Sequence, residues 1–381
     1  NRSPLRGNSF ATPPLGALSQ PSSPPFPSNA MLMNRLFFLS LFLPLLSCST
    51  QERTAAMIET ESPVQVREFI YEQAPFPSCH ASTIVETRGG ALLAAWFGGT
   101  DEGDKDVAIW LSRRENPGWT APVEVVNGIQ NDTLRYPCWN PVLFQPASGA
   151  LRLYYKVGPN PREWWGMVME SNDEGRSWSA PERLADSLLG PVRNKALALD
   201  GDIVIAPSST EHDGWRVHME RSTDGGNTWQ WIGPVSDPGD LGAIQPAVLQ
   251  YPDGRLRMLC RTQKRVIGSS WSADQGATWS PMEATELPNP NSGIDALTLQ
   301  DGRHLLVYNP TAPPEGKWGG PRSPLVVAVS DDGENWEQIA LLENEPGAEF
   351  SYPAVIQARD GKVHITYTWK REKIRHVVIG V

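Results

Sequence analysis

Short apolar runs dominate the chain from Phe69 to its C-terminus, and most of them come in pairs separated by a glycine turn. Residues 81–85 and 91–96 form one such pair, and both runs are rich in residues that favour β-strands. The turns end at Gly90, Gly149, Gly201, Gly254, Gly302 and Gly361, so consecutive turns are 48 to 59 residues apart. Six units of roughly 50 residues, each long enough for four strands, predict an all-β fold, a six-bladed β-propeller. A two-sheet sandwich is the alternative, and it fits less well because it does not demand a six-fold repeat.

A second repeat, of the form Ser-x-Asp-x-Gly-x-Ser/Thr-Trp, runs out of phase with the first. Full copies occupy residues 171–178, 222–229 and 272–279, a shortened copy occupies 330–336, and a degenerate copy covers 112–119. These residue types suit a tight turn, because Asp accepts hydrogen bonds from backbone amides, Gly adopts positive φ and Trp packs beneath the turn. We therefore predict that the copies are turns between strands.

The N-terminal 47 residues contain three arginines and no acidic residue. Arg35 precedes an apolar run over residues 36–46, which is far shorter than the roughly 20 residues needed to span a bilayer. A basic residue followed by a short apolar run is typical of a secretory signal peptide. Residues 45–48 also resemble a bacterial lipobox, so we expect lipidation of Cys48, with an ordinary signal peptide as the alternative.

The predicted organisation has three parts. A disordered leader and signal peptide cover residues 1–47, a linker covers 48–68, and the propeller covers 69–381. The protein is expected to be exported, as a bacterial outer-membrane lipoprotein or into the periplasm or medium. We expect a monomer whose only membrane contact is the possible lipid anchor.

Composition narrows the choice of ligand. The chain carries 33 Lys and Arg against 43 Asp and Glu, a net charge of -10. This argues against nucleic-acid binding, because phosphate contacts need clustered Lys and Arg. Three cysteines far apart, Cys79, Cys138 and Cys260, form no disulfide framework, and no zinc-site spacing appears, so we expect free thiols and no required cofactor. Residues 100–106 have the oxygen density of a calcium loop without its usual spacing; solvated acids are the preferred interpretation and bound Ca²⁺ the alternative.

Polar residues start the first strand of each blade, although the strands that follow them are apolar. They are His80, Asn140, Lys195, Gln245, Asp295 and Tyr352. Because these innermost strands line the axis of a propeller, their starts converge at one end of it, here called the mouth. The ends of the second strands lie at the same end and add, among others, Asp101, Glu102, Glu211, Arg261, Lys370 and Arg371. A polar funnel with several cations in an acidic protein predicts a binding site for an acidic oligosaccharide or polysaccharide.

His80 is the best acid–base candidate in this set, because imidazole titrates near neutrality. Trp139 and Trp164 are candidates to stack on sugar faces, with the propeller core as the other interpretation of each. The residues expected to bind substrate are Arg135, Trp139, Asn140, Trp164, Lys195, Glu211, Gln245, Arg261, Asp295 and Lys370.

The second repeat matches the Asp box, and with it the chain resembles the sialidase (neuraminidase) superfamily. The resemblance implies that the boxes are structural turns away from the substrate, so Asp173, Asp224 and Asp274 are not catalytic candidates. It implies that Tyr352 stands where sialidases have their nucleophile. Asp101 and Glu102 lie near the expected acid/base position.

Sialidases also clamp a substrate carboxylate with three arginines. Arg261 matches one of these by blade position, and Arg135 and Arg322 match more loosely. The first arginine of the family belongs in a motif that opens the first blade, but the corresponding residues 76–80 contain none.

Several blocks, including residues 95–100, 139–143 and 289–296, look like a branch of Asp-box proteins that resembles lyases releasing rhamnose from glucuronic acid in plant arabinogalactan. That resemblance implies a uronate lyase, in which Lys195, Arg261 and Arg135 neutralise the carboxylate and His80 is the base. An exo-sialidase with Tyr352 as nucleophile is the alternative. A glycan-binding propeller without catalysis is the second alternative.

Overall fold

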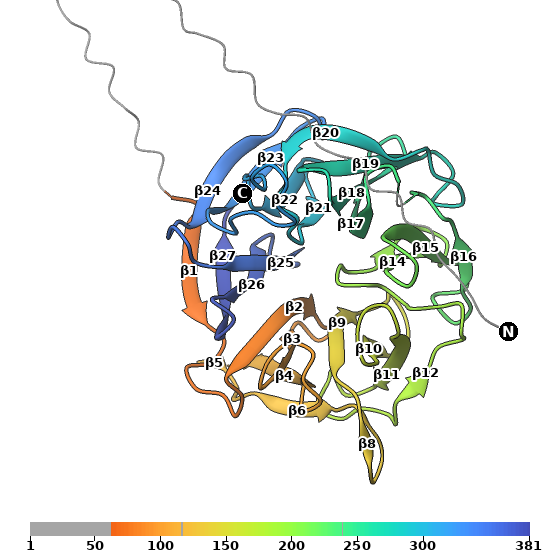
Figure 1. Cartoon of the computed structure of the whole chain (residues 1–381), viewed down its shortest axis with the longest axis vertical. Coiled ribbons are helices and arrows are strands. Elements are labelled where there is room, and N and C mark those ends of the chain that lie inside the picture. The colour runs from red at the N-terminus through yellow and green to blue at the C-terminus, as the bar shows by residue number, and fades with distance from the viewer. Residues whose placement is uncertain (1–61, 116, 238) are drawn as a thin grey trace, which may run out of the picture. The chain divides into compact units, whose positions relative to one another are not determined.

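The computed structural model describes residues 62–115, 117–237 and 239–381. Cys48, the apolar run before it and nearly all of the residues expected before the propeller lie outside this part of the chain. The described residues contain strands and no helix, so none of them forms a helix that could cross a membrane. Six sheets surround a common axis, which confirms the predicted six-bladed β-propeller (Figure 1).

Each of the first three blades begins with its innermost strand and runs outward. Blade 1 contains β2 (Ser78–Glu86), β3 (Leu92–Gly99), β4 (Ala108–Glu115), β5 (Gly118–Trp119) and β6 (Val123–Val126). Blade 2 contains β9 (Cys138–Phe144), β10 (Leu151–Val157), β11 (Trp165–Ser171) and β12 (Glu182–Arg183). Between them lies a hairpin of β7 (Ile129–Asn131) and β8 (Leu134–Arg135). Blade 3 contains β13 (Leu197–Ala198), β14 (Val204–Thr210), β15 (Arg216–Ser222) and β16 (Gln230–Ile232).

The remaining three blades follow the same antiparallel order. Blade 4 contains β17 (Ala243–Gln250), β18 (Leu256–Thr262), β19 (Val266–Ser272) and β20 (Glu283–Pro288). Blade 5 contains β21 (Asp295–Thr298), β22 (His304–Tyr308), β23 (Leu325–Ser330) and β24 (Glu337–Glu343). Blade 6 contains β25 (Phe350–Gln357), β26 (Val363–Trp369), β27 (Lys373–Ile379) and β1 (Val64–Phe69).

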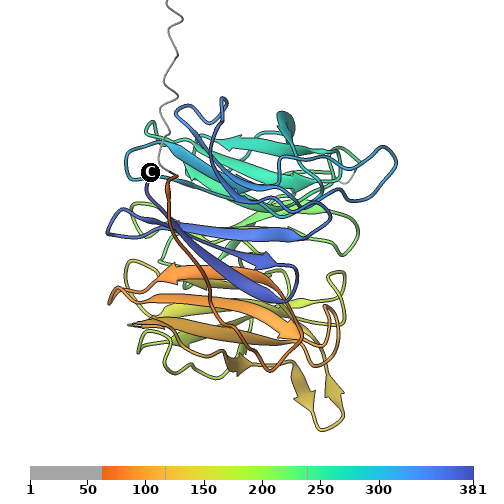
Figure 2. The same cartoon turned by 90° about the vertical axis from the view of Figure 1, so that its left-hand side faces the viewer.

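Strand β1 closes the ring, because it completes the last blade as its outermost strand. It pairs antiparallel with β27, with Arg67 opposite Val377 and Phe69 opposite Arg375. Figure 2 shows the orange N-terminal segment in front of the blue strands of this blade. Residues 64–68, which the sequence analysis assigned to the linker, are therefore part of the propeller.

The Asp boxes are turns between the third and fourth strands of their blades, as predicted. In the first full copy the Ser171 hydroxyl donates to Asp173 (2.8 Å) and accepts from the Gly175 amide (2.7 Å). Asp173 in turn accepts from the Ser177 amide (2.8 Å). The copies starting at Ser222 and Ser272 repeat these contacts. In each of these boxes the Asp carboxylate accepts hydrogen bonds from backbone amides of its own turn. The Asp side chains therefore stabilise the turns and are not available to a ligand site.

Candidate functional site

Four of the six innermost strands carry a β-bulge close to the mouth. Ala81, Asn140, Gln245 and Tyr352 have φ between 41° and 57°, and the pairing register shifts beside each of them. Positive φ is uncommon for residues other than glycine, and bulges re-aim side chains out of the regular alternation of a strand. Local backbone strain of this kind clusters at functional sites. The bulges therefore mark the mouth as the candidate site.

Tyr352 lies at the centre of a group of arginines. Its hydroxyl accepts a hydrogen bond from Arg261. The guanidinium carbons of Arg193, Arg261 and Arg322 lie 5.3, 5.8 and 5.7 Å from the centre of the Tyr352 ring. These residues come from blades 3, 4, 5 and 6, so the closed ring of sheets is what brings them together.

Arg261 is buried and held by neutral groups. Its Nε donates to Asn291 (2.7 Å) and its Nη1 to Gln245 (3.4 Å), while its guanidinium lies 4.8 Å from the Trp215 ring. The indole of Trp215 donates to Glu211 (2.8 Å). Burial raises the pKa of Glu211, against opposing contributions from the Trp215 hydrogen bond and the Arg261 charge. Arg261, Gln245 and Glu211 thus belong to one network; that they bind substrate stays a prediction.

Glu349 joins two further arginines at the rim of this group. It accepts from Arg322 (2.7 Å), from Arg371 (2.8 Å) and from the Ser351 hydroxyl (2.7 Å). Burial acts to raise the pKa of Glu349, but the charges of Arg322 and Arg371 outweigh it and hold the pKa below its ordinary value. Arg371 also pairs with Glu102 from blade 1. The two carboxylates hold Arg371 beside the mouth.

His80 lies beneath Tyr352, with 4.0 Å between the ring centres. Its Nδ1 is hydrogen-bonded to the Thr368 hydroxyl (2.9 Å), and its Nε2 is buried with no hydrogen-bond partner. Burial lowers its pKa well below the ordinary value, and the nearby arginines, first among them Arg371, lower it further. His80 is therefore neutral near pH 7. The predicted base is present, but its free nitrogen is covered in this arrangement.

The loop after β3 carries the two acids expected to act as acid/base. Glu102 is held in the ion pair with Arg371, whereas Asp101 is exposed and its carboxylate accepts from the Glu102 amide (2.8 Å). Asp106 accepts from both the amide and the hydroxyl of Thr100 (3.0 and 2.8 Å). Within the described part of the chain, no group of three or more His, Cys, Asp or Glu side chains is arranged to hold a metal ion.

Lys195, which is partly exposed, and Asp295, which is buried, form an ion pair that faces the central channel. Lys195 Nζ donates to Asp295 (2.8 Å), and Asp295 accepts from the Val355 amide (2.8 Å). Both side chains line a cavity of about 290 Å³ together with Gln250 and Thr298, which end their strands at the opposite side of the propeller. Burial lowers the pKa of Lys195 and the Asp295 charge opposes it. In this arrangement Lys195 is paired with Asp295, and its binding of a substrate carboxylate stays a prediction.

The two predicted stacking tryptophans are core residues. Trp139 and Trp164 pack against each other, with ring centres 6.0 Å apart, in a buried cluster with Leu189 and Val192. They are 5% and 4% exposed. Neither ring has a face exposed to a sugar, which agrees with the interpretation of both residues as part of the propeller core. Asn140, on a bulge next to Trp139, is also buried.

Two predicted cations lie outside the Tyr352 network. Arg135, on the β7–β8 hairpin, donates to the backbone oxygen of Asp106 (2.7 Å). Lys370 pairs with Glu345 (2.7 Å) and lies 4.6 Å from the Trp369 ring. Both cations are thus engaged elsewhere. The arginines that lie next to the Tyr352 ring are Arg193, Arg261 and Arg322.

The structure adds four residues to the site that the sequence did not single out: Arg193, Trp215, Asn291 and Glu349. Arg193 is buried and donates to the backbone oxygens of Ile294 (2.8 Å) and Pro353. Strand β13 begins only at Leu197, so the residue of blade 3 that lies at the mouth is Arg193, two residues before the Lys195 that the repeat suggested. An arginine so close to the predicted strand start was the one feature of the sequence that could have pointed to it.

With the geometry in place, the fold and its arginine-rich mouth define a class of protein, the sialidase-like propellers. The family model described as "BNR repeat-like domain" matches residues 90–365, and the chain belongs to this family.

Individual relatives are distant. The anhydrosialidase of Macrobdella decora is 22% identical over 236 residues, which cover 54% of this chain and 30% of that protein, so the chain spans about a third of this relative's length. A protein of unknown function from Dyadobacter fermentans has a TM-score of 0.68 at 16% identity, over 84% of this chain and 98% of the other. The intramolecular trans-sialidase from Ruminococcus gnavus has a TM-score of 0.64 at 12% identity, over 82% and 97%. At these identities the structural likeness shows the fold alone.

Proposed function

We propose that this protein removes a terminal, carboxylate-bearing sugar from an acidic glycan, with Tyr352 as the reacting side chain. The observation that carries the proposal is the hydrogen bond from Arg261 to the Tyr352 hydroxyl, inside a ring of arginines in a protein of net charge -10. Some relatives with the same fold are named as sialidases or trans-sialidases, which supports this reaction class without specifying the substrate.

The contact with Arg261 suits Tyr352 to nucleophilic attack. A guanidinium can only donate, so the phenol oxygen is the acceptor and its own proton remains available to another base. As the oxygen attacks the anomeric carbon, its proton passes to a carboxylate, for which Glu211, linked to Arg261 through Trp215, is the candidate. The glycosidic bond breaks and the leaving oxygen takes a proton from an acid. Asp101 comes from the loop beside Arg371 and is the candidate for this acid, because Glu102 is held in the ion pair with Arg371. Water then releases the sugar from Tyr352.

We propose that a carboxylate clamp forms at the mouth although the first arginine of the family is absent from the sequence of blade 1. Arg371 lies in the turn between β26 and β27, and its backbone oxygen accepts from the Cys79 amide (2.8 Å), next to His80. The turn places a cation beside the stretch where the sialidase resemblance led us to expect one. Arg261, Arg322 and Arg371 are the three side chains that we assign to the substrate carboxylate. This arrangement favours the sialidase-type reaction over the uronate lyase.

One observation keeps the lyase as a second candidate. The Nε2 of His80 has no partner and lies under Tyr352, where a base for a C5 proton would be needed. For His80 to act, the Tyr352 ring must move aside, because the nitrogen is buried.

A pair of assays tests both reactions. Full-length protein is incubated with a fluorogenic sialoside, and separately with arabinogalactan whose glucuronate residues carry terminal rhamnose, while the ultraviolet absorbance of an unsaturated uronate is followed. Fluorophore release that Tyr352→Phe abolishes supports the proposal. Rising absorbance that His80→Ala abolishes would replace it with the lyase. Binding of either glycan without turnover would leave a glycan-binding propeller and refute the catalytic proposal.

A further inference from the structure

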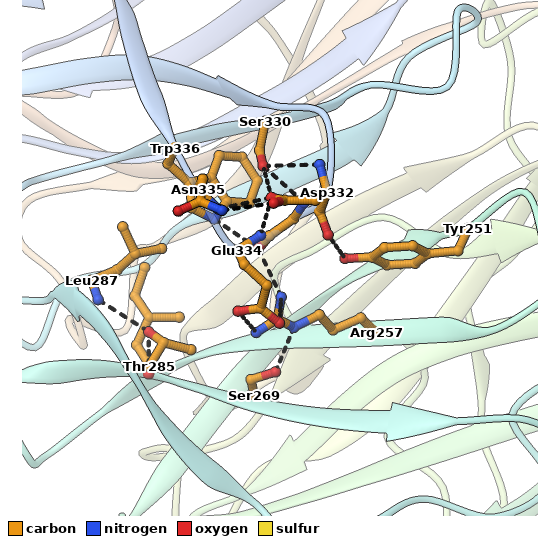
Figure 3. A network of polar contacts seen from close by, with 12 residues as sticks. Tyr251, Arg257, Ser269, Thr285, Leu287, Ser330, Asp332, Glu334, Asn335 and Trp336 are labelled. Carbon is orange, nitrogen blue, oxygen red and sulfur yellow. Dashed lines mark hydrogen bonds and ion pairs between the residues drawn. The ribbon is translucent and has the colours of Figure 1, made fainter.

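A cavity of about 630 Å³ lies between blades 4 and 5, away from the Tyr352 group. Strand β20 forms one wall through Glu283 and Thr285, and the shortened Asp box forms the other through Glu334 and Trp336 (Figure 3). The box follows β23, which runs in the same direction as the innermost strand β21 and hence away from the mouth. The cavity therefore belongs to the opposite side of the propeller, and nothing in the proposed reaction uses it.

Strand β20 supplies most of one wall. It has six residues, whereas the outer strands β12 and β16 of blades 2 and 3 have two and three, and five of the six, residues 283–287, line the cavity. The outer strands β24 and β1 of blades 5 and 6 are of similar length to β20, with seven and six residues. The cavity volume lies within the range of small-molecule sites, roughly 300–1,000 Å³.

Arg257 makes the floor of the cavity rigid. Its buried guanidinium donates to the Ser269 hydroxyl (2.7 Å), to the Gly333 backbone oxygen (2.7 Å) and to Glu334 (3.1 Å), as Figure 3 shows. It also lies 4.9 Å from the Trp271 ring. A floor fixed by these contacts is organised before any ligand arrives.

The carboxylate of Glu334 is a departure from the repeat that the turn itself does not need. In the shortened box the Asn335 amide donates to Asp332 (2.7 Å), as the Ser and Thr hydroxyls do in the full copies. The equivalent contact between blades 2 and 3 involves no acid from the box: Arg152 donates to the backbone oxygens of Gly225 and Gly226 (both 3.0 Å). The turn is thus closed without Glu334, whose side chain is 59% exposed at the cavity.

The charges select the kind of ligand. The cavity is lined by three carboxylates, those of Glu283, Glu286 and Glu334, and by one cationic side chain, that of Arg257. An acidic sugar is therefore repelled here, in contrast to the mouth. Sugar hydroxyls both donate and accept, which suits carboxylates beside hydroxyl and amide groups. The half-buried ring of Trp336 supplies apolar surface for the face of a sugar. We propose that this cavity is a second carbohydrate site that binds a neutral saccharide.

The test uses full-length protein and three neutral disaccharides, lactose, cellobiose and maltose, titrated by calorimetry, with glucuronic acid as the charged comparison. Ala284→Trp places an indole on the exposed wall strand and fills the recess, while Gln230→Trp puts the same side chain on the exposed strand β16 as a matched control. We expect at least one disaccharide to bind with a dissociation constant on the order of 1 mM, about 4 kcal/mol. Binding should weaken at least tenfold in Ala284→Trp and stay unchanged in Gln230→Trp.

Three results would overturn the proposal: no binding of any of the three disaccharides, equal binding by Ala284→Trp, or tighter binding of glucuronic acid in the same cavity. If Ala284→Trp does not fold, the double substitution Glu283→Gln and Glu286→Gln takes its place. Both side chains are exposed, and their loss should weaken binding severalfold. Binding at this cavity is measured without turnover, so its outcome is independent of the reaction proposed at Tyr352.

Discussion

A chain of buried hydrogen bonds ties the closing strand β1 to the rest of blade 6. His364 on β26 bonds to His376 on β27 (3.0 Å), and His376 bonds to Glu68 on β1 (2.9 Å). The indole of Trp119 also donates to Glu68 (3.1 Å). Because this series of hydrogen bonds joins the first and last strands of the propeller, protonation of its histidines should control the stability of the closed ring.

The magnitude follows from His364. Burial, with smaller contributions from the positive charges of His376, Arg114 and Lys362, lowers the pKa of this imidazole from 6.5 to about 4, against the opposing charge of Asp360. Between these two pKa values the unfolded chain binds a proton that the folded chain does not, so stability falls as the pH drops from about 6.5 to about 4. A difference of about 2.5 between the pKa values corresponds to about 3.4 kcal/mol, and solvent screening reduces the expected loss to about 2 kcal/mol.

The other two groups in this series of hydrogen bonds, His376 and Glu68, either lower the stability in the same pH range as His364 or act at lower pH. Burial also lowers the pKa of His376, which adds to the loss in acid. The hydrogen bond with His376 lowers the pKa of Glu68 to about 2, although burial opposes it. The stability contributed by Glu68 is present above about pH 4.5 and is lost only as the pH falls toward 2.

The substitution His364→Gln removes the titrating group and keeps a donor for His376. Urea unfolding near pH 7 and near pH 4.5 should show that wild-type protein loses about 2 kcal/mol more on acidification than the variant does. His212→Gln, on an exposed loop, is the matched control and should behave as wild type. An identical pH dependence for His364→Gln and wild type would refute the reasoning.

Three further predictions concern the mouth and the turns. Tyr352→Phe should lower kcat by about three orders of magnitude or more without changing the melting temperature, and a smaller loss would exclude a nucleophilic role. Arg371→Ala should lower kcat/KM about 10- to 100-fold on a carboxylate-bearing substrate, equivalent to about 1.5–3 kcal/mol. On the methyl ester of the same substrate the loss should be much smaller. Equal losses on both substrates would show that Arg371 does not bind the carboxylate. Ser222→Ala should cost about 1–2 kcal/mol of stability in urea unfolding and leave kcat unchanged, since its hydroxyl serves only the Asp box.

The blades could be predicted from the sequence because each is encoded locally. An apolar run, a glycine turn and a second run specify a hairpin within about 20 residues, and the Asp box marks the next turn. Strand β1 could not be predicted in this way, because its partner β27 lies some three hundred residues away: Val66 is opposite Val378. Nothing in residues 64–69 alone distinguishes an outer strand from a linker.

The membership of the site was only partly predictable for a related reason. Tyr352, Gln245 and Arg261 were found because the starts and ends of strands converge at the mouth. Lys195 and Asp295 fit the same rule and yet form an ion pair that lines the cavity reaching the opposite side of the propeller. The first strand of blade 3, β13, has two residues and begins only at Leu197, so Lys195 precedes it and the chain contacts Tyr352 through Arg193 instead. The pattern of apolar runs does not reveal so short a first strand.

The charge of Arg261 is the feature of the mouth that a purely structural role explains least. Its hydrogen-bond partners Asn291, Gln245 and Tyr352 are all neutral in their ordinary forms, whereas Arg322 and Arg371 share Glu349. A buried cation without a bound carboxylate is costly, and replacing it by an apolar residue would generally stabilise a fold. Its retention is explained if negative charge arrives during function, either on the Tyr352 oxygen or as the carboxylate of a sugar. The mouth is in that case organised in advance for the anion, at the expense of the stability of the empty protein.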